Sequence, residues 1–95
     1  MYMKKIMIVK RNGNLEKFDP ERVRKAVRAS AERVMVDLTD EAMEKIVNKV
    51  VELLETQTSN PTVEQVHSCC EVALESINPL VAKSYREYRD YKKDI

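Results

Sequence analysis

Cationic side chains gather near the start of the sequence in a pattern that suits a small anion. Lys10 and Arg11 are adjacent, and Arg22 follows a short segment later. Such groups form strong charge-assisted hydrogen bonds with phosphate oxygens. Glu16 and Asp19 lie between these cations, and their carboxylates can accept a hydrogen bond from the exocyclic amino group of adenine, which guanine lacks at that position. The stretch therefore predicts cations for a phosphate and acceptors for an adenine base.

Sequence motifs for the common phosphate-binding loops are absent. The chain has one glycine, Gly13, and one glycine cannot build a Walker loop or a Gly-x-Gly-x-x-Gly turn. A nucleotide site would have to use side-chain cations and the N-terminus of a helix. The alternative for each cation is an ordinary solvated charge. His67 has no nucleophile at a supporting spacing, so the sequence shows no catalytic set and we expect no enzymatic activity from this domain.

A β-hairpin that leads into a helix is expected to carry these side chains. Residues 2–10 and 14–18 contain β-forming residues, and between them Asn12-Gly13 is the pair preferred in a two-residue type I′ turn. In that register Val9 pairs with Glu16. Because successive side chains of a strand point to opposite faces, the side chains of Lys10 and Arg11 should point away from each other. One face would carry Met7, Val9, Arg11, Glu16 and Phe18, and the other Ile6, Ile8, Lys10, Leu15 and Lys17.

Four helices should follow the hairpin. Asp19-Pro20 is a typical helix start, with Asp as N-cap and Pro at the first helical position. Apolar residues at helical spacing predict helices from Asp19 to about Met35, from Thr39 or Asp40 to the loop at 56–61, from Thr62 to residue 77, and from Pro79 onward. We therefore predict one α+β, mostly helical domain over residues 1–95. A hairpin at 1–18 would cap a four-helix bundle at 19–95.

Three motifs resemble the ATP-cone domain in the order and separation of that family. Residues 9–13 (VKRNG), followed by an acid and the pair Phe18-Asp19, resemble its opening motif. Residues 62–66 (TVEQV) resemble the start of its third helix, and residues 81–89 (VAKSYREYR) resemble its closing motif. Arg22 stands where the family usually has Lys, which keeps the charge but alters the hydrogen-bond geometry.

The resemblance implies a set of nucleotide contacts. Lys10 and Arg11 would bind the nucleotide, Glu16 and Asp19 would lie nearest the base, and Phe18 would anchor the hairpin to the helices. Thr62 would be a further contact, although an N-cap role explains it equally well. The complete implied set is Lys10, Arg11, Glu16, Lys17, Phe18, Asp19, Arg22, Thr62 and Arg89, with Arg89 reaching the phosphates.

Composition limits the other classes of function. The net charge of +1 does not favour a nucleic-acid partner. Cys69 and Cys70 are adjacent, and with only His67 nearby they do not make a zinc site. We expect one of the two to be buried and the other to lie at the flank of a helix. Free thiols and the lack of an apolar run of about 20 residues favour a cytoplasmic protein without a membrane partner.

The resemblance to the ATP-cone domain, together with the cations and acids of the hairpin, implies a regulatory module that binds ATP or dATP as effector, with or without Mg²⁺. It would exert allosteric control over a ribonucleotide reductase or a related protein, through a parent enzyme or other copies of itself. The alternative is a small helical module that binds protein or nucleic acid and has no ligand. Thermal stabilisation by ATP would distinguish the two.

Overall fold

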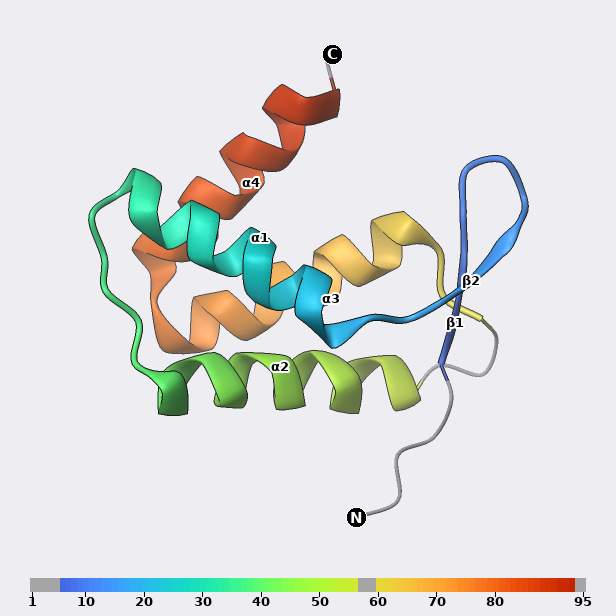
Figure 1. Cartoon of the computed structure of the whole chain (residues 1–95), viewed down its shortest axis with the longest axis horizontal. Coiled ribbons are helices and arrows are strands. Elements are labelled where there is room, and N and C mark those ends of the chain that lie inside the picture. The colour runs from blue at the N-terminus through green and yellow to red at the C-terminus, as the bar shows by residue number, and fades with distance from the viewer. Residues whose placement is uncertain (1–5, 57–59, 94–95) are drawn as a thin grey trace.

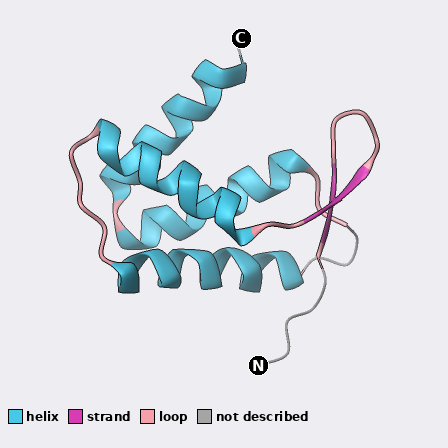
Figure 2. Cartoon of the chain, in the orientation of Figure 1, coloured by secondary structure: helices cyan, strands magenta, loops and turns pink. Residues whose placement is uncertain are grey.

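The computed structural model describes residues 6–56 and 60–93, with side chains up to Glu87. The elements in chain order are β1 (Met7–Val9), β2 (Leu15–Lys17), α1 (Pro20–Arg33), α2 (Asp40–Glu55), α3 (Val63–Ile77) and α4 (Pro79–Lys93). The predicted α+β, mostly helical fold is confirmed (Figure 2). The hairpin lies at one end of the molecule, beside the first turns of α1 and α3 (Figure 1).

Side chains at the helix starts match the predicted caps. The Asp19 carboxylate accepts a hydrogen bond from a backbone N–H in the first turn of α1, at 3.0 Å. Thr39 caps α2 in the same way. Thr62 forms a reciprocal capping box with Gln65, in which each side chain bonds the other residue's backbone N–H. These caps satisfy N–H groups that have no partner within the helix.

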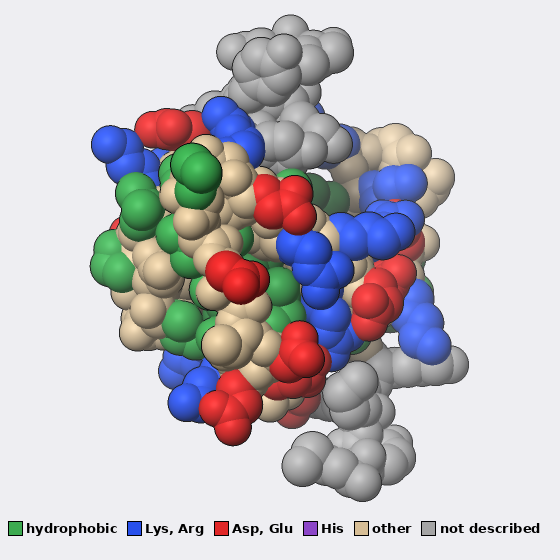
Figure 3. All heavy atoms as spheres, turned by 60° about the vertical axis from the view of Figure 1, so that its left-hand side comes forward, with side chains coloured by type: hydrophobic (Ala, Val, Ile, Leu, Met, Phe, Trp, Pro, Cys, Tyr) green, Lys and Arg blue, Asp and Glu red, His purple; other side chains and the backbone are tan. Residues whose placement is uncertain are grey.

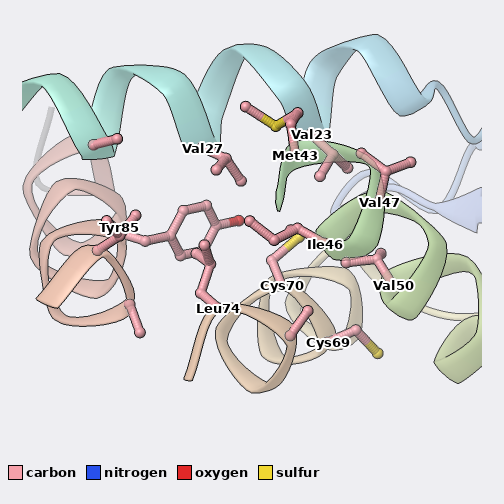
Figure 4. Packing of buried hydrophobic residues seen from close by; sticks show 14 of the residues in the cluster. Val23, Val27, Met43, Ile46, Val47, Val50, Cys69, Cys70, Leu74 and Tyr85 are labelled. Carbon is pink, nitrogen blue, oxygen red and sulfur yellow. The ribbon is translucent and has the colours of Figure 1, made fainter. Parts of the chain in front are cut away.

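The core is apolar and lies where the four helices meet. Its fully buried members include Val27 on α1, Ile46 and Val50 on α2, Leu74 on α3 and Val81 on α4. Figure 4 shows these helices contributing side chains from several directions to one cluster. The helical spacing of the apolar residues is therefore what selects the buried faces.

The prediction that only one of the two adjacent cysteines is buried is wrong. Cys69 is 9% exposed and Cys70 is 1% exposed. Neighbouring helical side chains point about 100° apart, but α3 packs against both α2 and α4. Both directions therefore meet a neighbouring element, which the sequence pattern of one helix could not reveal.

Ion pairs connect neighbouring helices of opposite net charge. Arg24 on α1 contacts Glu44 on α2 at 2.8 Å. Arg86 on α4 lies between Glu71 and Glu75 on α3, at 3.7 and 3.5 Å. Figure 3 shows basic and acidic side chains interspersed around hydrophobic atoms on the face that carries the α1–α2 loop. The charged residues are thus distributed as expected for a helical domain with net charge near zero.

The hairpin turn differs from the predicted type I′ turn. Lys10 N–H donates to the carbonyl of Asn14 at 2.8 Å, and Gly13 N–H donates to the carbonyl of Lys10 at 2.9 Å. The loop therefore has three residues, and within it only Gly13 has a positive φ, of 86°. A type I′ turn needs positive φ at both central residues, whereas a three-residue loop needs it at one. The Asn-Gly signal located the turn but gave the wrong length.

The longer loop changes the strand register by one residue. Ile8 pairs with Glu16, and Val9 pairs with Leu15. The predicted pairing of Val9 with Glu16, and with it the predicted division of the two faces, is therefore wrong, because a slip of one residue moves each side chain to the opposite face. Lys10 and Glu16 now share a face. The strands are also shorter than the predicted 2–10 and 14–18, and residues 2–5 lie outside the described part of the chain.

Backbone contacts attach the hairpin to the start of α3. Val9 N–H donates to the carbonyl of Pro61 at 2.8 Å, and Val9 forms a parallel bridge with Thr62. Arg11 at the turn contacts the Glu64 carboxylate at 3.0 Å. These contacts stabilise a two-stranded hairpin that would be marginal alone, and they fix its position over the ends of two helices.

Candidate functional site

A cavity of about 250 Å³ opens between the hairpin and the helices. The hairpin, α1, α3 and α4 all contribute to its wall. The lining residues are Ile8, Lys10, Glu16, Lys17, Phe18, Asp19, Arg22, Val23, Ala26, Val63, Val66, His67, Cys70 and Tyr85. Residues far apart in the sequence therefore meet at one site, at the end of the molecule where the hairpin lies (Figure 1).

Charged side chains of the cavity form a small network centred on Glu16. One carboxylate oxygen of Glu16 lies 2.7 Å from an Arg22 guanidinium nitrogen, and the other lies 3.4 Å from Lys10 Nζ. The side chains of Lys10 and Arg22 are 48% and 72% exposed, so the pairs contribute little to stability. A carboxylate has about four lone-pair sites, and Glu16 can therefore hold both cations and still accept another hydrogen bond. The cations can in turn exchange this partner for a phosphate.

Two helix N-termini border the same cavity. Asp19 and Arg22 belong to the start of α1, and Val63 is the first residue of α3. The N-terminus of a helix carries a partial positive charge, about half an elementary charge, that favours anions. Together with Lys10 and Lys17, the two helix starts make this region electrostatically favourable for a negatively charged ligand.

The rest of the cavity wall is apolar except for a polar cluster. Ile8 and Phe18 from the hairpin and Val23 from α1 line its sides. The polar cluster consists of His67, Tyr85 and Cys70. His67 Nδ1 lies 2.8 Å from the Tyr85 hydroxyl, and their rings are tilted by 53° with centroids 6.0 Å apart. The cavity thus combines charged, apolar and neutral polar surfaces.

The Cys70 thiol has low reactivity in this environment. Burial raises the pKa of its thiol to about 11, partly offset by a hydrogen bond with Tyr85. Figure 4 shows Tyr85 directed from α4 into the core toward Cys70. The thiolate is the reactive form of cysteine, so Cys70 is a poor nucleophile at neutral pH. Among the described residues there is also no group of three His, Cys, Asp or Glu side chains placed to hold a metal ion.

The structure brings together most of the residues that the sequence nominated. Six of them line the cavity: Lys10, Glu16, Lys17, Phe18, Asp19 and Arg22. Arg11 does not line it and pairs with Glu64 instead. Thr62 lies beside the site as the N-cap of α3. The side chain of Arg89 lies outside the described part. Nucleotide contacts from these residues stay a prediction.

Sequence reasoning missed the part of the cavity wall that the helices supply. These residues are Val23, Ala26, Val63, Val66, His67, Cys70 and Tyr85, together with Ile8 from the hairpin. Most are apolar residues at the helical spacing that predicts the helices, and that spacing alone indicates a buried face and no binding site. One signal could have nominated His67 as a site residue. It lies about one turn after the N-cap of a helix that begins beside the hairpin.

Fold and cavity together define a small α+β binding module with a cationic rim. The model of the ATP cone domain matches residues 6–94, which is nearly the whole chain. The chain therefore belongs to the ATP-cone family, and it is a nucleotide-binding regulatory module of the kind that takes adenine nucleotides as effectors. A comparison with curated proteins finds no match. Within the described ranges, no helix combines the length and apolar character needed to cross a membrane.

Proposed function

We propose that this domain senses ATP against dATP and controls a ribonucleotide reductase or a related protein allosterically. Catalysis would belong to the regulated protein. The nucleotide would bind in the cavity between the hairpin, α1 and α3, with or without Mg²⁺ on its phosphates. Its immediate partners would be a parent enzyme or other copies of the same chain. The effector could change assembly only through different affinities for the two states of the protein.

The observation that carries the proposal is the cationic rim beside an apolar cavity. Lys10, Lys17 and Arg22 line one site together with the starts of α1 and α3. The cations and helix N-termini suit phosphates, and the apolar wall suits a base. Glu16 and Asp19, which also line the site, would accept a hydrogen bond from the adenine amino group.

Calorimetric titration of the chain with ATP, dATP and GTP tests the proposal. ATP and dATP should bind, GTP should bind more weakly, and ATP should raise the melting temperature by mass action. A chain whose melting temperature does not change with saturating ATP would favour the alternative, a helical module that binds protein or nucleic acid without a small ligand.

Two adjacent cations provide a matched pair of variants. Lys10 lines the cavity, whereas Arg11 points to Glu64. Lys10→Ala should weaken ATP binding by about tenfold or more, since charge-assisted hydrogen bonds contribute about 1.5–3 kcal/mol. Arg11→Ala should have the smaller effect. An equal loss in both variants would mean that the phosphates lie over the turn and outside the cavity.

A further inference from the structure

Glu16 holds the two cations of the cavity rim with the two oxygens of one carboxylate. One oxygen lies 2.7 Å from an Arg22 guanidinium nitrogen, and the other lies 3.4 Å from Lys10 Nζ. Lys10 belongs to the hairpin and Arg22 to the first turn of α1, and all three residues line the cavity. An anionic group therefore lies between the cations that a bound phosphate would use.

A phosphate group would need the position that this carboxylate occupies. Carboxylate and phosphate oxygens both accept charge-assisted hydrogen bonds from guanidinium and ammonium groups, and the cations themselves have donors only. A phosphate that contacts Lys10 and Arg22 at the same time would lie between them, where Glu16 lies in the structure. Two anionic groups at that position would repel each other, so phosphate binding requires the carboxylate to move away.

Displacement of the carboxylate is feasible because the two ion pairs are weak. The side chains of Lys10 and Arg22 are 48% and 72% exposed, and an exposed ion pair changes an equilibrium by a factor of about five at most. Charge-assisted hydrogen bonds to phosphate are stronger than that. A polyphosphate can therefore take both cations from Glu16, but its affinity is reduced by the pairs that it has to break.

We propose that the Glu16 carboxylate competes with the phosphates of the ligand for Lys10 and Arg22, and so sets the phosphate affinity of this cavity. The inference rests on the proposed function and deepens it. The displaced carboxylate would stay at the cavity wall, because Glu16 belongs to β2, which is paired with β1. Its oxygens would then be available to the adenine amino group, so that one side chain links phosphate binding with selection of the base.

Titration calorimetry of the whole chain with inorganic tripolyphosphate tests the competition. This ligand has phosphates but no base, so its affinity does not depend on the acceptor role of Glu16. Glu16→Gln keeps the length of the side chain and removes its charge, and hydrogen bonds of a neutral amide to the cations are weaker. Tripolyphosphate should bind Glu16→Gln about three- to thirtyfold more tightly than wild type, since two ion pairs of up to about fivefold each no longer oppose it.

Glu21→Gln is the matched control for the change in charge. Glu21 lies one residue before Arg22 and pairs with Arg24, and neither Glu21 nor Arg24 lines the cavity. This variant should change tripolyphosphate affinity by less than about twofold at physiological ionic strength, because salt screens exposed charges that do not contact the ligand. A gain as large as that of Glu16→Gln would overturn the inference, because loss of any nearby acid would then have the same effect.

A background without Arg22 separates competition from simple repulsion. Arg22→Ala removes one of the two ion pairs, so adding Glu16→Gln should raise tripolyphosphate affinity by at most about fivefold, and by less than in the presence of Arg22. An equal gain with and without Arg22, or no gain in Glu16→Gln, would overturn the inference even where the wild-type chain binds ATP. Failure of the wild-type chain to bind ATP would instead overturn the proposed function, and the inference with it.

Discussion

Replacing Met35 with glycine should stabilise the domain, because Met35 occupies a backbone conformation that favours glycine. Its φ is 57°, in the left-handed region. Met35 N–H donates to the carbonyl of Glu32 at 3.1 Å, and Val36 N–H donates to the carbonyl of Ala31 at 2.9 Å. This pair of bonds is the Schellman motif, whose left-handed position is usually glycine. The Met35 side chain is 94% exposed, so its removal forfeits almost no burial.

The expected gain follows from two opposing terms. An L-residue in the left-handed region costs about 1–2 kcal/mol. Glycine increases the conformational entropy of the unfolded chain, which costs roughly 0.4–1 kcal/mol. Met35→Gly should therefore raise the free energy of unfolding by about 0.5–1 kcal/mol. For a domain of this size that corresponds to an increase in melting temperature of about 2–8 °C.

Thermal and denaturant unfolding followed by circular dichroism measure this effect. Met35→Ala is the matched control, since alanine also removes the long side chain but keeps the β-carbon that makes the conformation unfavourable. Met35→Ala should show little of the gain. If the two variants are equally stable, the backbone conformation at Met35 does not limit stability and the reasoning is refuted.

Three further predictions concern the site. Glu16→Ala and Asp19→Ala should each reduce the difference between ATP and GTP affinity in paired titrations, mainly by weakening ATP binding. Asp19→Ala should also lower the free energy of unfolding by about 1 kcal/mol, because it removes an N-cap, whereas Glu16→Ala should lower it by less than about 0.5 kcal/mol. Equal melting temperatures of the two variants would contradict this difference in stability. ATP affinity should fall as salt rises, because exposed cations meet the phosphates; a salt-independent titration would speak against the cationic rim. Since the Cys70 pKa is raised from 9.0 to about 11, the folded state holds its proton more tightly, so stability should fall as pH rises from about 9 to about 11. The decrease in stability between these pH values should be smaller in Cys70→Ala. If wild type and Cys70→Ala lose stability equally with pH, the Cys70 thiol is not the group responsible.

Local sequence signals were sufficient to predict the helices. Asp19, Thr39 and Thr62 begin their helices in the structure as their side-chain chemistry predicts, because a cap bonds backbone groups within its own first turn. Helical spacing also predicted most of the buried faces, with the exception of the adjacent Cys69 and Cys70, which are both buried. The cations and acids near the hairpin could likewise be nominated from residue type, since their charge does not depend on the fold.

Tertiary structure alone decided the strand register and the composition of the cavity. Asn12-Gly13 permits more than one turn length, and contacts of Val9 with Pro61 and Thr62 bind the hairpin in the observed register. That register puts Lys10 and Glu16 on one face and joins both to Arg22. His67 and Tyr85 are 18 residues apart, and no local rule pairs them. They meet because α3 and α4 pack together, which depends on the whole core and on no single stretch of the sequence.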